Sequence, residues 1–425
     1  MVKLATMKEK QTLNRSLHTA KSAKQDEFYT QYVDIQKEVE AYLEFDPNTF
    51  KGKIVYCNCD DPFESNFFKY FAANFNKLGI KKLITTSYDG SPIAGQLSLF
   101  PEHTDGNCKR PKPKAVGVIV DHVKDENNDG ATDIEDVKAF LKKNNASRIA
   151  LKADGKYPGG DFRSAECVEF LKQADIVVTN PPFSLFREYL AQLMTHGKKF
   201  LIIGNINAIT YKEVFPLIKE NTIWLGNGMG RWISGFIVPK SYELYGTEAR
   251  IDESGDRIVA TNNCLWLTNI DHGRRHQPLP LMTMADSLRF SKHKEINGKD
   301  SYDRYDNYDA IEVPFTDAIP SDYKGMMGVP ITFLDKYNPD QFEILGWARG
   351  IDEFDAYPTK RYVNPKQIKP DGRVSNGGKV NTGPTLLLKQ KPSVTYYTAD
   401  NADGYLVQLY MRILICHRRT KGAKN

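Results

Sequence analysis

The stretch that most constrains this chain is residues 175–183, Asp-Ile-Val-Val-Thr-Asn-Pro-Pro-Phe. Four apolar or β-branched residues in succession are typical of a parallel strand that is covered on both faces. The prolines push Asn180 out of the helical region and fix the next backbone angles, which predicts a stiff loop with bare carbonyls. Residues 184–190 then predict a helix with Ser184 near its N-cap. Strand, loop and helix together place Asn180 at the carboxyl end of a strand, where open α/β sheets bind ligands.

Such a loop suits methyl transfer to the exocyclic amine of a planar base. The amine lone pair is delocalised, and the Asn180 side-chain oxygen and the Pro181 carbonyl can hold both N–H groups and draw the nitrogen towards a tetrahedral geometry. Pro182 keeps the corner rigid, and Phe183 offers a stacking face for a base outside the duplex. A sulfonium donor loses its charge during transfer, so catalysis is mostly positioning. The alternative is an ordinary turn, since Asn and Pro are common turn residues.

The composition is that of a globular protein with room for two or three domains. The 425 residues are 40% hydrophobic, and a formal net charge of +5 permits nucleic-acid binding without demanding it. No apolar run reaches spanning length and the N-terminus lacks an apolar signal core, so we expect a cytoplasmic protein without a membrane segment. The cysteines form no CxxC pair, which predicts neither a zinc site nor a disulfide scaffold. They are Cys57, Cys59, Cys108, Cys167, Cys264 and Cys416.

Two charged stretches each have a functional and an ordinary interpretation. Residues 1–25 carry six basic side chains against the single acid Glu9, which predicts either a basic arm along phosphates or a solvated tail. Residues 125–136 have the acidic spacing and central glycine of a calcium loop, but they end in Asp136 where such loops have Glu. We favour a solvated acidic loop there and expect no metal site.

Two further stretches place polar side chains where a cofactor would bind. Residues 54–58 predict the first core strand. Asp60 and Asp61 follow it, where an acid can hold hydroxyl or ammonium groups of a nucleoside cofactor or simply lie in a solvated turn. Asp161 can accept a hydrogen bond from an adenine amino group while Phe162 stacks on its ring. The alternative is a glycine-rich turn in which Asp161 and Ser164 cap the next helix.

Strands and helices alternate as far as residue 203, which predicts an α/β fold with a mainly parallel sheet and helices on both faces. From about residue 271 the composition changes to a basic cluster, residues 274–276, and a tyrosine-rich stretch, residues 301–308, suited to groove and phosphate contacts or to ordinary packing. Residues 351–404 predict long loops. We expect a basic arm over 1–25, a catalytic domain over 26–270 with an insertion at about 87–145, and a target-recognition region over 271–425.

Several stretches of the chain together resemble the EcoRI-type DNA adenine-N6 methyltransferases. They are residues 26–31, 55–62, 160–164, 175–184, 242–252, 263–269 and 328–334. The resemblance implies a Rossmann-like S-adenosylmethionine-dependent methyltransferase fold with a C-terminal target-recognition region. It also implies site-specific methyl transfer to N6 of a flipped adenine in double-stranded DNA, as in restriction–modification or phage self-protection.

The resemblance implies a set of cofactor-binding residues as well. They are Phe28, Tyr29, Thr30, Asn58, Asp60, Asp61, Asp161 and Phe162. The first three belong to a segment that helps to hold the methionine part of S-adenosylmethionine, and the last two meet its adenine. Where many methyltransferases have a Gly-x-Gly turn after the first strand, this chain has Ser-Asn-Phe at 65–67, which leaves open which of residues 58, 60 and 61 contacts the cofactor.

Other partners and activities follow from the same residues. We expect a monomer that binds double-stranded DNA, with any cognate restriction endonuclease acting separately, in a bacterial or phage-infected cell. One alternative is the same loop chemistry directed at RNA or at a protein glutamine. Another is a non-catalytic DNA-binding protein that keeps the loop as scaffold.

Overall fold

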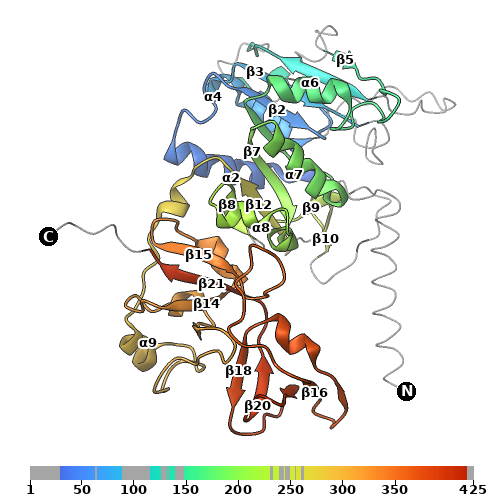
Figure 1. The fold of residues 1–425 in the computed structure, drawn as a ribbon. Helices are drawn as coiled ribbons and strands as arrows, with labels where there is room; N and C mark the ends of the chain where they lie inside the picture. The colour runs from blue at the N-terminus through green and yellow to red at the C-terminus, as the bar shows by residue number, and fades with distance from the viewer. Residues whose placement is uncertain are drawn as a thin grey trace. The chain divides into compact units, whose positions relative to one another are not determined.

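The computed structural model describes residues 29–62, 65–88, 115–125, 132–133, 135–137, 139, 148–229, 233–238, 244, 249–253, 255–259 and 263–418. The basic arm, Phe28 and most of the calcium-like loop lie outside these residues. The chain divides into two compact units, Met1–Val214 with Ile223–Gly273, and Phe215–Thr222 with Arg274–Asn425. Figure 1 shows the helices and strands of each unit.

Within the described residues, the first unit is built on an eight-stranded sheet with the order β5-β4-β3-β2-β6-β7-β12-β8. Its central strands β3, β2, β6 and β7 run parallel to one another, whereas β4, β5, β12 and β8 pair antiparallel with their neighbours. The bounds are β2 Ile54–Asn58, β3 Lys82–Thr86, β4 Val116–Val120, β5 Arg148–Ala150, β6 Ile176–Thr179, β7 Lys199–Asn205, β8 Trp224–Met229 and β12 Cys264–Thr268. The α/β class is confirmed.

The expectation of a mainly parallel sheet holds for the centre of this sheet and is wrong for its edges. A parallel neighbour needs a long crossover, usually a helix, and the central strands have such helices between them. The alternation ends after β7, and β12 then pairs antiparallel with it, with Trp266 opposite Ile203. On the other side, β4 lies within the expected insertion, and it pairs antiparallel with β3 as part of the main sheet.

Helices cover both faces of the central strands, because successive strand residues point to opposite sides. Val55 joins the apolar cluster that includes α2 and α3, and Phe67 of α3 meets Trp266 with ring centroids 5.9 Å apart. On the other face, Tyr56 meets Phe170 of α6 at 6.2 Å. Figure 1 shows α6 and α7 in front of the sheet. The helices are α2 Tyr32–Phe45, α3 Asn66–Ala73, α4 Phe75–Leu78, α6 Ala165–Gln173 and α7 Phe186–Thr195. None of the described helices is long and apolar enough for a membrane crossing.

A small second sheet in this unit brings the start of the described chain to the main sheet. Its order is β1-β9-β11-β10, with Thr30 of β1 opposite Phe236 of β9. The bounds are β1 Tyr29–Thr30, β9 Phe236–Val238, β10 Arg250–Ile251 and β11 Arg257–Val259. The last two form an antiparallel hairpin whose tip is closed by the Asp252 carboxylate, which accepts from the Asp256 N–H at 2.8 Å.

The second unit consists mainly of two antiparallel or mixed sheets, with the orders β13-β14-β21-β15 and β17-β16-β19-β20-β18. Their bounds are β13 Ala310–Glu312, β14 Met326–Pro330, β15 Phe342–Trp347, β16 Lys366–Ile368, β17 Val374–Asn376, β18 Thr385–Leu388, β19 Tyr396–Thr398, β20 Tyr405–Gln408 and β21 Arg412–His417. Its helices are α8 Phe215–Lys219 and α9 Met284–Phe290. Phe215 of α8 packs on Trp347 at 4.8 Å between ring centroids.

The long loops predicted for residues 351–404 are interrupted by four short strands, β16 to β19. The sequence did not indicate them, because strands of three or four residues are too short to show a period. Of the two interpretations of the tyrosine-rich stretch, burial of Tyr302, Tyr305 and Tyr308 favours ordinary packing. Of the basic cluster, Arg274 is already engaged inside the unit by Asp335 at 2.6 Å.

Candidate active site

The carboxyl ends of β2 and β6 lie side by side, because the two strands pair in parallel with Tyr56 opposite Val177. Thr179 is the last residue of β6, and its hydroxyl donates to the Asp60 carboxylate and also contacts the Asn58 main-chain carbonyl. Asn180 is the next residue along the chain. The link therefore fixes the root of the Asn-Pro-Pro-Phe loop to the segment that follows β2.

Asp60 is an internal anchor of this edge of the sheet. It is only 6% exposed, and its second carboxylate oxygen accepts from the Ser65 hydroxyl at 2.6 Å. Its main-chain N–H donates to the Thr86 main-chain carbonyl at 3.1 Å, and its own carbonyl accepts from the Thr85 hydroxyl at 2.6 Å. Because each of its carboxylate oxygens already holds a hydroxyl, Asp60 ties β3, α3 and β6 together.

The chain turns sharply directly after β2. Cys59 has a φ of 65°, in the left-handed region that normally favours glycine. Ser65 is the N-cap of α3, where its hydroxyl accepts from the Phe67 N–H at 3.1 Å. The sharp turn after β2 is thus made at a cysteine, and residues 65–67 form the N-cap and first residues of α3.

Asn58 is also held within the protein. It is 1% exposed, and its side-chain oxygen accepts from the hydroxyl of Tyr189 on α7. Burial raises the pKa of Tyr189 well above its ordinary value, so this hydroxyl keeps its proton and acts as the donor. Phe162 meets the same tyrosine edge-on, with ring centroids 5.0 Å apart, and is 3% exposed.

The glycine-rich turn before α6 lies against the end of β3. Gly160 has a φ of +75°, and a Cβ there would lie 1.7 Å from the Ser87 carbonyl oxygen. Asp161 accepts from the Nε and Nη2 atoms of Arg163 at 2.9 and 2.8 Å. Ser164 caps α6 by accepting from the main-chain N–H three residues on. The capping interpretation holds for Ser164, whereas Asp161 makes an ion pair.

The Asn-Pro-Pro-Phe loop leads into a single 3₁₀ turn. Asn180, Pro182 and Phe183 are half-buried, and Pro181 is buried. The Leu185 N–H donates to the Pro182 carbonyl at 3.0 Å, which closes the turn η2 (Phe183–Leu185). The helix α7 therefore starts at Phe186 with Leu185 as its N-cap, one residue after Ser184, which the sequence placed near the cap. The diproline geometry favours the tighter turn before the helix can begin.

The start of the described chain reaches the same edge. The Asn66 side chain donates to the Thr30 carbonyl at 2.8 Å, so β1 is tied to the N-terminus of α3. Phe236, opposite Thr30, lies 6.2 Å from Phe183 between ring centroids. The Thr30 hydroxyl is buried and has no hydrogen-bond partner within the described part of the chain. Asp61 is half-buried, and its carbonyl accepts from the Ser65 N–H at 2.8 Å.

The structure thus brings all the expected site residues that it describes to one edge of the sheet. Two residues of this site, Thr179 and Tyr189, were not among those predicted from the sequence. Thr179 gave a signal, because a hydroxyl in the last strand position before Asn180 must find a partner when buried. For Tyr189 the signal is the helical spacing of the buried residues in α7, Phe186, Tyr189, Leu190 and Leu193, which turns a phenol inwards.

Comparisons with known proteins identify relatives along nearly the whole chain. The family model described as adenine-specific methyltransferase EcoRI matches residues 16–418. The chain is 51% identical over 342 residues to the Type II methyltransferase M.EcoRI of Escherichia coli, which covers 80% of this chain and 92% of that protein. It is 34% identical over 378 residues to the Type II methyltransferase M.MpnI of Mycoplasma pneumoniae, covering 88% and 98%. Against M.MgeORF184P of Mycoplasma genitalium the identity is 35% over 376 residues, with the same coverage. No solved structure matches the chain.

Proposed function

The chain belongs to the family of EcoRI adenine-specific methyltransferases, and on that premise we propose that it methylates N6 of an adenine flipped out of a specific site in double-stranded DNA. The observation that supports this most is the Asn-Pro-Pro-Phe loop at the carboxyl end of β6, rooted through Thr179 on the segment after β2. The adenine-specific family and its Type II relatives favour DNA over RNA or protein glutamine, and an enzyme over a binding scaffold.

The proposed roles of the domains follow from the position of the candidate active site in the first unit. The first unit, whose central parallel strands carry polar residues at their carboxyl ends, acts as a Rossmann-like catalytic domain over about residues 26–270. Residues 271–425 act in target recognition, and residues 1–25 lie along DNA phosphates. The enzyme works as a monomer in the bacterial cytoplasm, and a cognate restriction endonuclease acts separately.

The groups at the strand ends fit S-adenosylmethionine as the methyl donor. The buried Thr30 hydroxyl is available for the methionine part, alongside Tyr29 and Phe28, of which Phe28 lies outside the described residues. The adenine part falls to the turn that carries Asp161 and Phe162, whose buried side chains are held by Arg163 and Tyr189. When bound, the cofactor supplies a methyl group on a positively charged sulfur.

Among the polar residues after β2, the exposure of each side chain indicates whether it can contact the cofactor or instead supports the surrounding loops. Asn58 and Asp60 are buried and hold hydroxyls of the protein, whereas Asp61 is half-buried. We assign Asp61 the direct contact with ribose hydroxyls or the ammonium group. Asn58 and Asp60 then position the loops around it.

The loop itself positions the target base. The Asn180 side-chain oxygen and the Pro181 carbonyl accept the two N6 hydrogens, which turns the nitrogen lone pair out of the ring plane. Pro182 fixes the corner, and Phe183 stacks on the adenine face while its own ring rests near Phe236. Because the donor loses positive charge in the reaction, these residues act mainly by orientation.

The test of this function is methyl transfer from tritiated S-adenosylmethionine to plasmid DNA, followed by sequencing of modified bases. We expect N6-methyladenine at one short recurrent sequence. Label that enters only RNA or protein would move the activity to one of the alternatives.

A further inference from the structure

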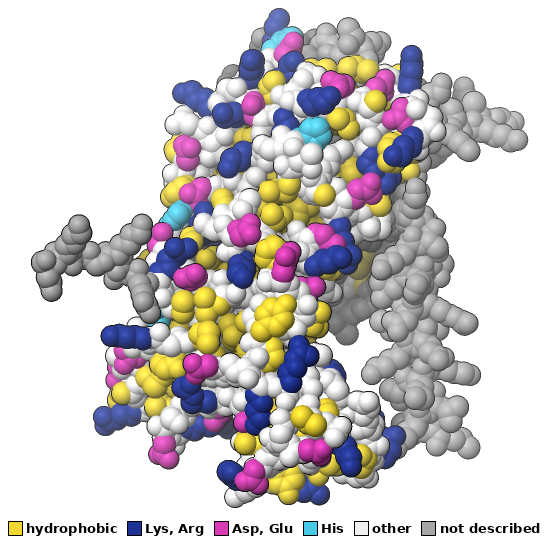
Figure 2. All heavy atoms as spheres, in the orientation of Figure 1, with side chains coloured by type: hydrophobic (Ala, Val, Ile, Leu, Met, Phe, Trp, Pro, Cys, Tyr) yellow, Lys and Arg dark blue, Asp and Glu magenta, His cyan; other side chains and the backbone are white. Residues whose placement is uncertain are grey.

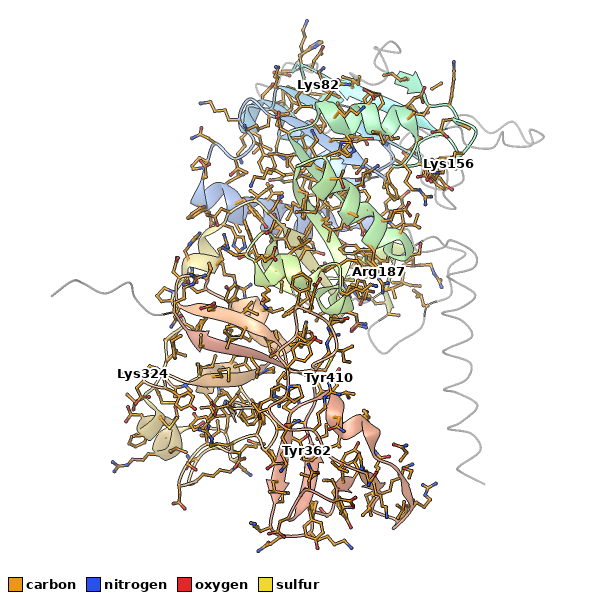
Figure 3. All side chains as sticks on the ribbon, viewed as in Figure 1. Lys82, Lys156, Arg187, Lys324, Tyr362 and Tyr410 are labelled. Atoms are coloured by element: carbon orange, nitrogen blue, oxygen red, sulfur yellow. The ribbon has the colours of Figure 1, made fainter. Side chains whose placement is uncertain are left out.

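An exposed arginine, Arg187, lies beyond the carboxyl ends of the strands, as the Asn-Pro-Pro-Phe loop does. It takes no part in the proposed methyl transfer. Arg187 is the second residue of α7, which follows this loop, and Tyr211 follows the 3₁₀ turn η3 (Ile206–Thr210) that ends β7. Both residues therefore lie beyond the carboxyl ends of adjacent strands. Figure 3 shows the Arg187 side chain beside α7.

The Arg187 guanidinium lies over an aromatic ring while its terminal donors stay available. Its central carbon lies 4.2 Å from the centroid of the Tyr211 ring, and the side chain is 58% exposed. The nearest acid is Glu213, whose carboxylate is 3.8 Å from Nε, too far for a hydrogen bond. Among the described residues no acceptor is bonded to the Nη1 and Nη2 atoms. A stacked guanidinium keeps its planar fork oriented, which suits bidentate binding of a phosphate.

A second arginine at the same edge shows the contrasting arrangement. Arg163 is 19% exposed and gives Nε and Nη2 to Asp161 and Nη1 to Glu188 at 3.1 Å. Its donors are used within the protein, so it supports the turn before α6. Arg187 differs because its terminal nitrogens face solvent.

We propose that Arg187, stacked on Tyr211, binds a backbone phosphate of the substrate DNA strand next to the flipped adenine. This rests on the proposed function. Flipping rotates a nucleotide about its backbone, so the neighbouring phosphates have to be held close to the loop that receives the base. The N-terminal end of α7 adds a favourable field for an anion at this place. On the face drawn in Figure 2, Lys and Arg side chains are mixed with Asp and Glu and form no single patch.

The experiment measures methyl transfer to plasmid DNA for Arg187→Gln, Arg187→Lys and a control, Lys172→Gln. Lys172 is similarly exposed and also pairs with one glutamate, but it lies in the last turn of α6, at the opposite edge of the sheet. We expect Arg187→Gln to raise the KM for DNA about tenfold, with kcat and the KM for S-adenosylmethionine close to wild type. The slope of log kcat/KM against log salt should fall by about one.

The remaining variants separate a phosphate contact from a structural role. Arg187→Lys should keep the salt slope and raise the KM for DNA less, since the charge stays and the fork is lost. Tyr211→Ala should raise the KM for DNA, and Tyr211→Phe should not. An unchanged KM for DNA and salt slope in Arg187→Gln would overturn the proposal, and so would a change in thermal stability alone. If the wild-type enzyme itself methylates no plasmid DNA, the proposed function fails and not this contact.

Discussion

The hydroxyl of Thr179, the last residue of β6, donates to the carboxylate of Asp60, the second residue after β2. One side chain thereby joins the two strand ends that would face base and cofactor. Because Thr179 directly precedes Asn180, any shift of the segment after β2 is transmitted to the loop that orients the amine. We propose that the catalytic geometry depends on this link between neighbouring parallel strands.

Replacing Thr179 with valine keeps the side-chain shape and removes the donor. We expect kcat to fall by roughly tenfold to a hundredfold through misplacement of the loop. The free energy of unfolding should fall by about 1–3 kcal/mol, because a buried carboxylate oxygen loses its partner. Thr179→Ser restores the hydroxyl and should recover most activity. Steady-state kinetics and urea unfolding check both, and a valine variant with wild-type kcat would contradict the role of the link.

Gly160 and Gly155 form a matched pair for the turn before α6. Both have positive φ, but a Cβ on Gly160 would meet the Ser87 carbonyl oxygen at 1.7 Å, whereas nothing lies within 4 Å of one on Gly155. Gly155→Ala should cost about 1–2 kcal/mol of unfolding free energy from backbone strain. Gly160→Ala should cost more and also weaken S-adenosylmethionine binding, since it displaces Asp161. Equal stabilities of the two variants would show that the close approach to Ser87 is unimportant.

If Asp61 contacts the cofactor, replacing Asp61 and replacing its neighbour Asp60 should have different effects. Asp61→Asn should weaken S-adenosylmethionine binding about tenfold through loss of a charge-assisted hydrogen bond, with little change in melting temperature. Asp60→Asn should lower the melting temperature, because its carboxylate holds Ser65 and Thr179. Calorimetric titration and thermal unfolding of both variants provide the comparison. The reverse pattern would assign the contact to Asp60.

Tyr189 gives a pH dependence with a definite sign. Burial raises its pKa well above the ordinary value of about 10. Below pH 10 the folded and unfolded states both keep the proton. At higher pH the unfolded state releases it first, so stability falls as pH rises. Tyr189→Phe should make this alkaline loss shallower and cost about 1–3 kcal/mol at pH 7, since Asn58 loses its donor. Urea unfolding at pH 7 and pH 11 measures both, with the exposed Tyr410→Phe as control. Parallel pH profiles would contradict the assignment.

Local signals in the sequence predicted the centre of the fold well. The apolar run before Asn180 is β6, because strand character there depends on neighbours in sequence. The antiparallel edge strands depend on which strand β12 meets in space, and nothing in its own residues encodes that direction. The helix α7 starts two residues after Ser184 for a local reason: the Leu185 N–H donates to the Pro182 carbonyl, which closes a 3₁₀ turn before the helix begins.

The sequence indicated candidate residues for the site, but not the hydrogen bonds that connect them. Asn180 and Asp60 stand out as polar residues after strands, yet which acid faces outwards is a matter of burial and could not be inferred from Asp60 and Asp61 in sequence. The two partners of the buried Thr179 hydroxyl, Asp60 and Asn58, lie 119 and 121 residues away along the chain. The Asp161–Arg163 ion pair joins neighbours in sequence. It could not be predicted, because the spacing allows Asp161 equally well to cap α6.

We propose above all that Asn180 holds the target amine, and single-turnover methylation by Asn180→Ala tests this most directly. Tritiated S-adenosylmethionine and plasmid DNA are the substrates, and cofactor affinity is measured in parallel. Asn48→Ala, an exposed asparagine before β2, serves as control. The account predicts a loss of the transfer rate on the order of a hundredfold or more in Asn180→Ala with cofactor binding close to wild type. Transfer at the wild-type rate in this variant would contradict it.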